Sequence, residues 1–422
     1  MAVEPAKPEE PPNVASASSA PNEGVERTPL DAGPGCLVLE ATKPRLRFDR
    51  NELAGAFGDL GTDLPLLVGM TLASGLHGAS VLTVFGLLQI ATGFWYRLPM
   101  PVQPLKAMAA IVIAQNIAAD VLLGGGLAIG FAMLLLALTG TLDHLARWIP
   151  KCVVRGIQLG LGLQLASIAL GRFVVADGVR GYFLAGIAFL LVVALLGNRR
   201  LPAALPVVAL GVVYAAVFHL DGSALRASFE FQLPNVYLPG PEAVLAGAVM
   251  LALPQLPLSL ANSVVATRQL VMDLFPGRQL TARRIGCTYA AMNLVAPWFG
   301  GVPVCHGSSG LAGHFAFGGR TGGSVVLYGG MFVVAGLFWG SGFEHLARAF
   351  PLPVLGILLL FEALALMSRV ADVAQAPREF GVALLVAVAA SGLPYGYLVG
   401  MVVGTLLVHL RWLPRKWVTD KQ

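Results

Sequence analysis

One lysine lies inside an apolar stretch, where a charged side chain is energetically costly. Lys106 occurs in MPVQPLKAMAAIVIAQ, about one turn into a predicted short helix. An ionisable side chain at membrane depth is costly and points to function, and the helix N-terminus beside it already carries about +0.5 charge. An anion would neutralise both charges. The alternatives are a structural pair with Asp59 or Asp63, or a side chain that extends to the membrane surface.

A second group of polar residues begins another short segment, VCHGSSGLAGHF. His306, Ser308 and Ser309 are hydrogen-bond donors at a predicted helix N-terminus, and Gly307 would let a ligand approach the backbone closely. Two facing helix N-termini supply about +1 together and Lys106 adds one, which suits a divalent oxyanion. Ordinary helix capping by the serines and a satisfied buried histidine are the alternatives.

Two carboxylates lie in the first apolar span, NELAGAFGDLGTDLPLLVGMTLASG. Asp59 and Asp63 are four residues apart, so they share a helical face, with Thr62 beside them. Carboxylates in such a place are costly and invite protonation. These two could relay a proton or form a structural pair with Lys106. Glu362, in LLLFEALALMS, is another buried carboxylate that the sequence alone does not assign to the site.

Neutral polar side chains could complete such a site. The segment LPQLPLSLANSVVATRQL presents Gln255, Asn262 and Ser263, either to a ligand or to neighbouring helices. Cys305 and His306 are adjacent, so they do not face each other on a helix, and no acid is placed to orient the histidine. An intramembrane enzyme is therefore disfavoured. The four cysteines show no metal-ligand spacing, and no metal or cofactor is expected.

The composition indicates the scaffold that must position these residues. Of 422 residues, 56% are hydrophobic and 12% charged, about half the charged fraction of soluble domains, and the mean hydropathy is +0.74. This argues against a soluble enzyme, a nucleic-acid-binding protein or a disulfide scaffold, and predicts an all-α polytopic membrane protein. Residues 1–45 are expected to be a disordered tail, 46–413 the transmembrane domain and 414–422 a cytoplasmic C-terminal tail.

Fourteen transmembrane segments are expected. They cover residues 52–75, 78–97, 104–118, 123–141, 152–172, 181–197, 202–219, 241–265, 283–299, 306–317, 323–341, 351–368, 378–391 and 394–412. The segments 104–118 and 306–317 are shorter than the roughly 20 residues that cross a bilayer. Each follows a Pro-rich extended piece, LPMPVQP or GGVPVCHG, so each is expected to be an extended stretch that leads into a half-helix.

The two halves of the chain match each other. LDHLARWIP at 142–150 matches FEHLARAFP at 343–351, and MPV at 100–102 matches VPV at 302–304, with offsets of 201 and 202. This predicts repeats over residues 50–220 and 240–413, in opposite orientations because seven is an odd number of spans. With both termini cytoplasmic, 23 of the 28 lysines and arginines are expected on the cytoplasmic side. Short, interrupted segments at corresponding places in two halves point to a transporter site.

Three segments of the sequence also resemble those of a known protein family. GAFGDLGTDLPLLVGMTLASGL, LPMPVQPLKAMAAI and FGGVPVCHGSSGLAGHFAFGGRTG resemble the signature segments of the plant and bacterial molybdate transporter family, which is related to the sulfate permease superfamily. The resemblance covers roughly residues 50–412. It implies the seven-plus-seven inverted-repeat fold of uracil permeases and sulfate permeases, with a core domain and a gate domain.

The resemblance also shows departures from sulfate permeases. Their helix-opening Ser-Arg pair corresponds to Ser309 and Gly310, so the positive charge is expected from Lys106 instead. Asn262 stands where many of them carry a glutamate, which leaves the proton-coupling residue open. The regulatory STAS domain of that superfamily is not expected, because only about nine residues follow the last span.

These observations predict a secondary active transporter, and not an enzyme, that imports molybdate across the plasma membrane by alternating access with protons. The residues expected to bind the anion are Lys106, Gln103, Ser308, Ser309, His306, Gly307, Asn262 and Thr62. Asp59 and Asp63 are expected to carry the proton. Sulfate or tungstate transport and an anion channel are the alternatives. A nucleotide-driven pump is disfavoured because the GxxxxGK motif is absent. A homodimer in the lipid bilayer, without a nucleic-acid partner, is expected.

Overall fold

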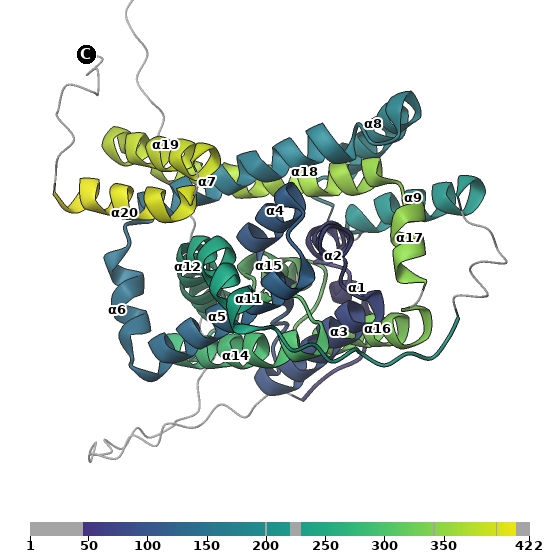
Figure 1. The fold of residues 1–422 in the computed structure, drawn as a ribbon, viewed down its shortest axis with the longest axis horizontal. Coiled ribbons are helices and arrows are strands. Elements are labelled where there is room, and N and C mark those ends of the chain that lie inside the picture. The colour runs from purple at the N-terminus through teal and green to yellow at the C-terminus, as the bar shows by residue number, and fades with distance from the viewer. Residues whose placement is uncertain (1–44, 199–200, 220–228, 341, 394, 411–422) are drawn as a thin grey trace, which may run out of the picture. The chain divides into compact units, whose positions relative to one another are not determined.

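The structure, a computed structural model, describes residues 45–198, 201–219, 229–340, 342–393 and 395–410. These residues belong to one compact unit, Thr42–Gln422. The predicted tails lie almost wholly outside the described residues. The regular secondary structure of the described part consists of helices and two short strands (Figure 1).

The elements follow one another as a series of apolar helices with short breaks. In chain order they are α1 (Arg50–Ala56), α2 (Leu60–Ser74), α3 (Gly78–Tyr96), β1 (Val102–Pro104), α4 (Lys106–Gln115), α5 (Ala119–Leu138), α6 (Thr141–Trp148), α7 (Lys151–Ile168), η1 (Ala169–Phe173), α8 (Gly178–Leu195), α9 (Ala204–Phe218), α11 (Pro241–Gly247), η2 (Ala248–Ala252), α12 (Leu253–Leu258), η3 (Ser259–Ala266), α13 (Thr267–Leu274), α14 (Ala282–Val295), η4 (Ala296–Phe299), β2 (Val304–His306), α15 (Ser308–Ala316), α16 (Gly323–Trp339), α17 (Phe343–Ala349), α18 (Leu352–Ser368), η5 (Arg369–Val373), α19 (Pro377–Gly392) and α20 (Gly396–His409).

The helices present apolar side chains outward. Phe183 on α8 is 73% exposed and Val388 on α19 is 67% exposed, a surface that lipid would cover and water would not favour. Six helices of the described part are long and apolar enough to cross a membrane. The prediction of a polytopic helical membrane protein is confirmed, but the fold is mostly helical rather than all-α, since it includes two short strands. Among the described residues, fewer helices reach full span length than the fourteen segments expected.

Two of the expected spans have a different course. The first, expected over 52–75, is divided into α1 and α2, because the chain turns where Gly58 lies against the backbone of Gly313; a Cβ atom on Gly58 would lie 2.4 Å from the Gly313 carbonyl. The eighth, expected to end at residue 265, continues to Leu274 and contains two π-helical segments, η2 and η3. Such π-helical segments often occur at functional sites.

The helices form two groups. In the first, α3 packs along α16, and α5 packs along α14 and α11. In the second, α7 packs against α18 and α19, and α8 and α9 pack against α18. Figure 1 shows α7, α8, α18 and α19 along the upper edge of the view, with α3, α5, α14 and α16 along the lower edge.

The two copies of the HLAR sequence form equivalent connections. The first copy is α6, which joins α5 to α7, and the second is α17, which joins α16 to α18. Figure 1 shows α6 and α17 on opposite sides of the view, each crossing between the two groups of helices.

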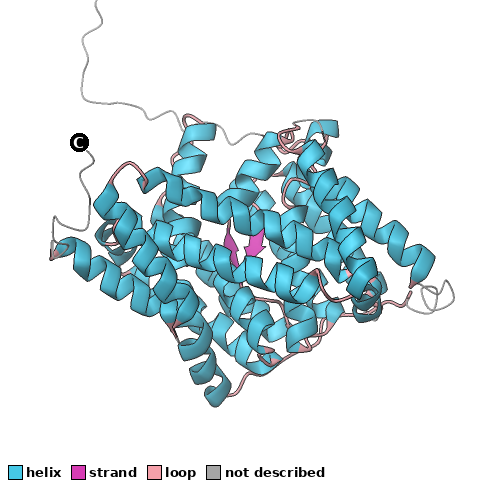
Figure 2. Ribbon diagram, turned by 90° about the horizontal axis from the view of Figure 1, so that it is seen from above, coloured by secondary structure: helices cyan, strands magenta, loops and turns pink. Residues whose placement is uncertain are grey.

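The strands meet in the middle of the helices (Figure 2). β1 and β2 pair antiparallel, with Val102 opposite His306 and Pro104 opposite Val304. Each strand is held by an amide side chain: Gln89 on α3 bonds both backbone groups of Val102, at 2.7 and 2.8 Å, and Asn293 on α14 bonds those of Val304, at 2.6 and 2.9 Å. Because the strands are antiparallel, α4 and α15, which follow them, start at opposite ends of this short ladder and leave it in opposite directions.

Candidate functional site

Lys106 lies between the starts of the two half-helices. It is the first residue of α4, directly after β1, and its side chain is 2% exposed. Its ammonium group donates a hydrogen bond of 3.0 Å to Ser309 Oγ, at the start of α15. The strand pairing therefore brings together the two polar segments that the sequence singled out, which are 203 residues apart.

Glu362 on α18 is the ion-pair partner of Lys106. Its Oε1 accepts from Lys106 Nζ, and its Oε2 accepts from Thr62 Oγ1 at 2.9 Å. The Glu362 side chain is 10% exposed, so the pair is almost removed from solvent. The sequence suggested Asp59 or Asp63 as structural partners for Lys106; Glu362 takes that place instead.

Asp59 belongs to the same chain of hydrogen bonds without touching Lys106. Gln103 Nε2, on β1, donates to both Asp59 carboxylate oxygens, at 2.6 and 2.8 Å. Gln103 Oε1 in turn accepts from Ser309 Oγ at 3.1 Å. A continuous chain of hydrogen bonds thus runs from Asp59 through Gln103, Ser309 and Lys106 to Glu362.

Asp63 has a different set of neighbours. It is fully buried, and its Oδ2 accepts from the hydroxyl group of Tyr328 on α16 at 3.1 Å. Its Oδ1 has no hydrogen-bond partner among the described residues. Asp59 lies directly before α2 and Asp63 in its first turn, but among the hydrogen bonds of the described residues only those of Asp59 join the chain to Lys106.

The N-termini of the half-helices differ in what covers them. At α4, Gln255 Oε1 accepts from the backbone N–H groups of Ala107 and Met108, at 2.9 and 3.2 Å. At α15, the hydrogen bonds found in the described part of the chain include no side chain that caps the N–H groups of Ser308 and Ser309. The first N–H groups of a helix have no partner inside it, so α15 offers its N-terminus to a ligand more directly than α4 does.

Small residues let the site residues approach α15 closely. A Cβ atom on Gly307 would lie 1.5 Å from Gln103 Oε1, and one on Gly310 would lie 2.2 Å from Asp59 Oδ2. An arginine at position 310, as in sulfate permeases, would have no space beside Asp59. The glycines hold polar side chains of this protein against the helix start, where the sequence suggested a ligand.

Asn262 contacts the same helix start from the π-helical segment η3. Its Oδ1 accepts from Ser308 Oγ at 3.0 Å. Its backbone carbonyl accepts from Thr267 Oγ1 at 3.1 Å, a hydroxyl group that also donates to the His306 carbonyl at 3.2 Å. The π-helical segment thereby joins α15 and β2 to the eighth span.

The side chain of His306, a predicted site residue, points away from Lys106 and Ser309. It belongs to β2 and not to α15. Its Nε2 lies 2.9 Å from Thr288 Oγ1, and its ring packs edge-on against Tyr96, with 5.3 Å between the ring centroids. Its imidazole contacts neither Lys106 nor Ser309.

A cavity of about 560 Å³ reaches the site from one side. Ser308 forms part of its wall, and three basic residues, Lys151, Arg155 and Arg369, outnumber one acidic residue, Asp273, among its charged lining residues. Arg155 pairs with Asp372, and Lys151 Nζ lies 3.7 Å from the same carboxylate. The cavity thus joins a basic surface to the start of α15.

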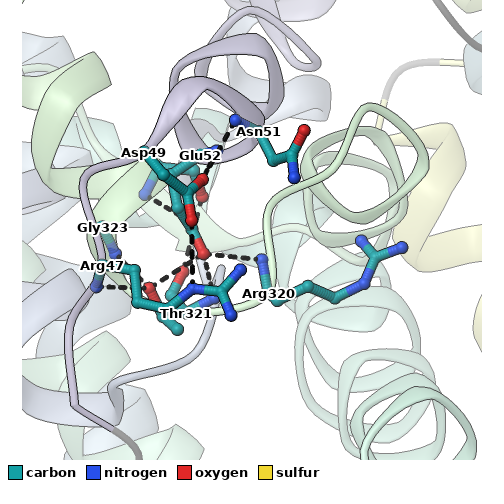
Figure 3. Close-up of polar contacts among 8 residues, drawn as sticks. Arg47, Asp49, Asn51, Glu52, Arg320, Thr321 and Gly323 are labelled. Atoms are coloured by element: carbon teal, nitrogen blue, oxygen red, sulfur yellow. Dashed lines mark hydrogen bonds and ion pairs between the residues drawn. The ribbon is translucent and has the colours of Figure 1, made fainter.

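A buried glutamate that the sequence did not single out fixes the first helix. Glu52 on α1 accepts from the backbone N–H groups of Arg320, Thr321 and Ser324, at 2.8 to 3.0 Å, and from Thr321 Oγ1 at 3.0 Å. Figure 3 shows Glu52, near the start of α1, in contact with Arg320 and Thr321 of the loop that follows α15. This attachment sets the position of α1 and hence of the turn that presents Asp59.

Buried acids, a lysine and hydroxyl groups around two opposed half-helices, within apolar helices, define a membrane transport protein. The family described as "Molybdate transporter of MFS superfamily" matches residues 51–165 and 247–366. Molybdate transporter 2 of Arabidopsis thaliana is 33% identical over 87% of this chain and 89% of its own, and molybdate transporter 1 of Chlamydomonas reinhardtii is 29% identical over 83% and 90%. The chain belongs to the molybdate transporter family, which confirms the resemblance and the prediction of a transporter rather than an enzyme.

Solved structures show where this fold occurs. The transmembrane domain of the cyanobacterial bicarbonate transporter BicA is similar with a TM-score of 0.64 and 16% identity, over 85% of this chain and 99% of that one. The murine Solute Carrier 26 family member A9 anion transporter, in the inward-facing state, is similar with a TM-score of 0.63 and 14% identity, over 87% and 69%. The chain shares its fold with these two transporters.

Proposed function

We propose that this protein is a secondary active transporter that imports molybdate by alternating access, coupled to protons. The observation that carries the proposal is the contact between Lys106 and Ser309, which joins the starts of two half-helices in a member of the molybdate transporter family. Helix N-termini with nearby hydroxyl and ammonium donors are suited to bind oxyanions.

The anion would bind at the start of α15. Ser308 and Ser309 would donate from their hydroxyl groups, and the backbone N–H groups after Gly307 would donate along the helix axis. Lys106 would supply the charge. Gln103, Thr62 and Asn262 would orient these donors through the hydrogen bonds that they already make to Ser309, Glu362 and Ser308. We assign His306 to holding β2, since its ring contacts Tyr96 and Thr288.

The charges around the site favour proton coupling. One lysine faces three buried or nearly buried carboxylates, those of Asp59, Asp63 and Glu362. A divalent anion would add two negative charges to a site that already has more acids than bases, so its entry requires protons to enter as well. Asp59, directly before α2, and Asp63, in the first turn of α2, are the carboxylates proposed from the sequence to exchange such protons.

The architecture supports alternating access. We propose fourteen spans in two inverted repeats, with the group around α3, α5, α14 and α16 as the core and the group around α7, α18 and α19 as the gate. The equivalent positions of α6 and α17, and of the amide clamps Gln89 and Asn293, support this repeat. With both termini cytoplasmic, the basic cavity beside Ser308 would open to the cytoplasm, and the anion would leave through it. We also propose a homodimer in the plasma membrane.

A titration of purified protein with molybdate, tungstate and sulfate tests the substrate. Saturable binding of molybdate that excess sulfate does not displace supports the proposal. Preferential binding of sulfate would make the protein a transporter of a different oxyanion, since the two anions share charge and geometry. Uptake into proteoliposomes tests the class: accumulation above the external concentration is expected of a coupled transporter, whereas flux that only follows the gradient would indicate a channel.

A further inference from the structure

The ion pair between Lys106 and Glu362 puts a carboxylate where an anionic substrate must bind. Lys106 Nζ already donates to Ser309 Oγ and to Glu362 Oε1. Among the described residues, Lys106 is the cation that joins the chain of hydrogen bonds around α15. While Glu362 is ionised, it neutralises the charge that would attract the anion.

Protonation would remove this competition. A neutral Glu362 would no longer hold Lys106 by charge, and the ammonium group would be free to face an anion at Ser309. Thr62 Oγ1, which donates to Glu362 Oε2 at 2.9 Å, would keep the neutral carboxyl group in place through its oxygens.

We propose that Glu362 is an internal counter-ion that competes with the substrate for Lys106, and that one proton must bind Glu362 for the anion to bind Lys106. This inference rests on the proposed oxyanion transport and names the residue that links the proton to the anion at the binding step. The proton comes from water on the side to which the site is open and returns to water when the anion leaves.

The surroundings of Glu362 contain few competing groups. On α4 the titratable neighbour is Lys106, and at the start of α2 the buried carboxylates are those of Asp59 and Asp63. The arginines on two other elements that pack against α18 point elsewhere: Arg155 on α7 pairs with Asp372, and Arg172 on η1 donates to the carbonyl group of Ile113. On the remaining elements, Arg180 and Tyr182 of α8 and Arg369 and Asp372 of η5 are exposed. The ring of Tyr214 of α9 packs against Phe218 and His219.

The position of Glu362 also links binding to movement. Lys106 and Ser309 lie at the starts of the half-helices α4 and α15, whereas Glu362 belongs to α18 in the second group. The ion pair is therefore a polar contact between a half-helix and the second group. Its exchange for an anion–lysine contact would release the start of α4 from α18 when both proton and anion are bound.

The test is calorimetric binding of molybdate to the purified full-length protein between pH 5.5 and 7.5, in buffers of different ionisation enthalpy, which count the protons taken up. For the natural protein, we expect the affinity for molybdate to fall about tenfold or more for each unit by which the pH rises, over part of this range. At least one proton should be taken up per molybdate bound. In Glu362→Gln, about one proton fewer should be taken up per molybdate bound. The change of molybdate affinity per pH unit should be smaller by a factor of about ten than in the natural protein. At pH 7.5 this variant should bind molybdate more tightly than the natural protein does.

Glu344→Gln is the matched control, since it removes the same charge from the exposed Glu344–Arg348 pair on α17; it should bind as the natural protein does. If Glu362→Gln does not fold, Glu362→Asp is tested in its place. Its shorter side chain weakens the ion pair with Lys106, so molybdate should bind more tightly at pH 7.5, and binding should still take up the proton. Equal proton uptake by the natural protein and Glu362→Gln would overturn the inference and leave the transport function intact. Failure of the natural protein to bind any of the three oxyanions would overturn the function itself.

Discussion

Lys106 has two partners that act oppositely on its ability to attract an anion. Ser309 directs the ammonium group toward the start of α15, and Glu362 neutralises it. The sequence identified Lys106 because a charge in an apolar stretch is costly wherever it lies. Its partner on α18 could not be read from the sequence, since they are 256 residues apart and a pairing over that separation depends on how the helices pack.

Lys106→Ala should abolish molybdate binding, with a loss of affinity of more than about 100-fold. It should also lower stability by about 3–5 kcal/mol, because it leaves Glu362 buried without its partner. The double variant Lys106→Ala with Glu362→Gln should regain most of that stability without regaining binding. Thermal unfolding and calorimetry on the same preparations measure both effects. Unchanged molybdate binding by Lys106→Ala would refute the assignment of the site.

His306 shows why local structure limits a prediction from sequence. Its neighbours Ser308 and Ser309 lie at the helix start as expected, but the extended stretch continues through His306. Side chains alternate between the two faces of a strand, so His306 faces Tyr96 and Thr288 and not the site. A shift of two residues in the expected start of a helix was enough to misplace the side chain.

At the scale of elements, the proline pattern predicted the half-helices well. Pro-rich pieces before residues 106 and 308 form β1 and β2, and α4 and α15 follow directly. The break between α1 and α2 and the cap that Gln255 provides for α4 were not predicted, because each depends on a distant backbone: that of Gly313 for the break and that of Ala107 for the cap. Packing between elements, rather than propensity within them, decides both.

Gly310→Ala tests the close approach of α2 to α15. The added methyl group would lie 2.2 Å from Asp59 Oδ2, so the carboxylate must move and the hydrogen bonds from Gln103 must break. We expect a loss of molybdate affinity of at least about tenfold and a loss of stability of about 1–3 kcal/mol. Gly330→Ala on α16 is the control: no heavy atom lies within 4 Å of its added Cβ, so both quantities should stay near those of the natural protein. Normal affinity in Gly310→Ala would show that Asp59 need not lie beside α15.

At the scale of the whole molecule, proton coupling predicts the direction of the pH dependence of uptake. Because the anion is expected to enter with protons, uptake into cells or proteoliposomes should rise as the external pH falls, and removal of sodium should have no effect. Asp59→Asn should weaken this dependence, since it removes a carboxylate from the chain of hydrogen bonds that includes Ser309 and Lys106. Uptake that is independent of pH and requires sodium would contradict proton coupling.

The orientation of the repeats can be tested at α6 and α17. His144 and His345 occupy equivalent positions in the two HLAR sequences, and both are exposed. If seven spans separate the repeats, the two positions lie on opposite sides of the membrane, His144 in the cytoplasm and His345 outside. In a variant without its four natural cysteines, a membrane-impermeant thiol reagent applied to intact cells should label His345→Cys, and should label His144→Cys only after the cells are opened. Labelling of both from outside would make the repeats parallel. The starts of α4 and α15 would then no longer be related by inversion, and the opposed half-helices on which the anion site depends would need another explanation.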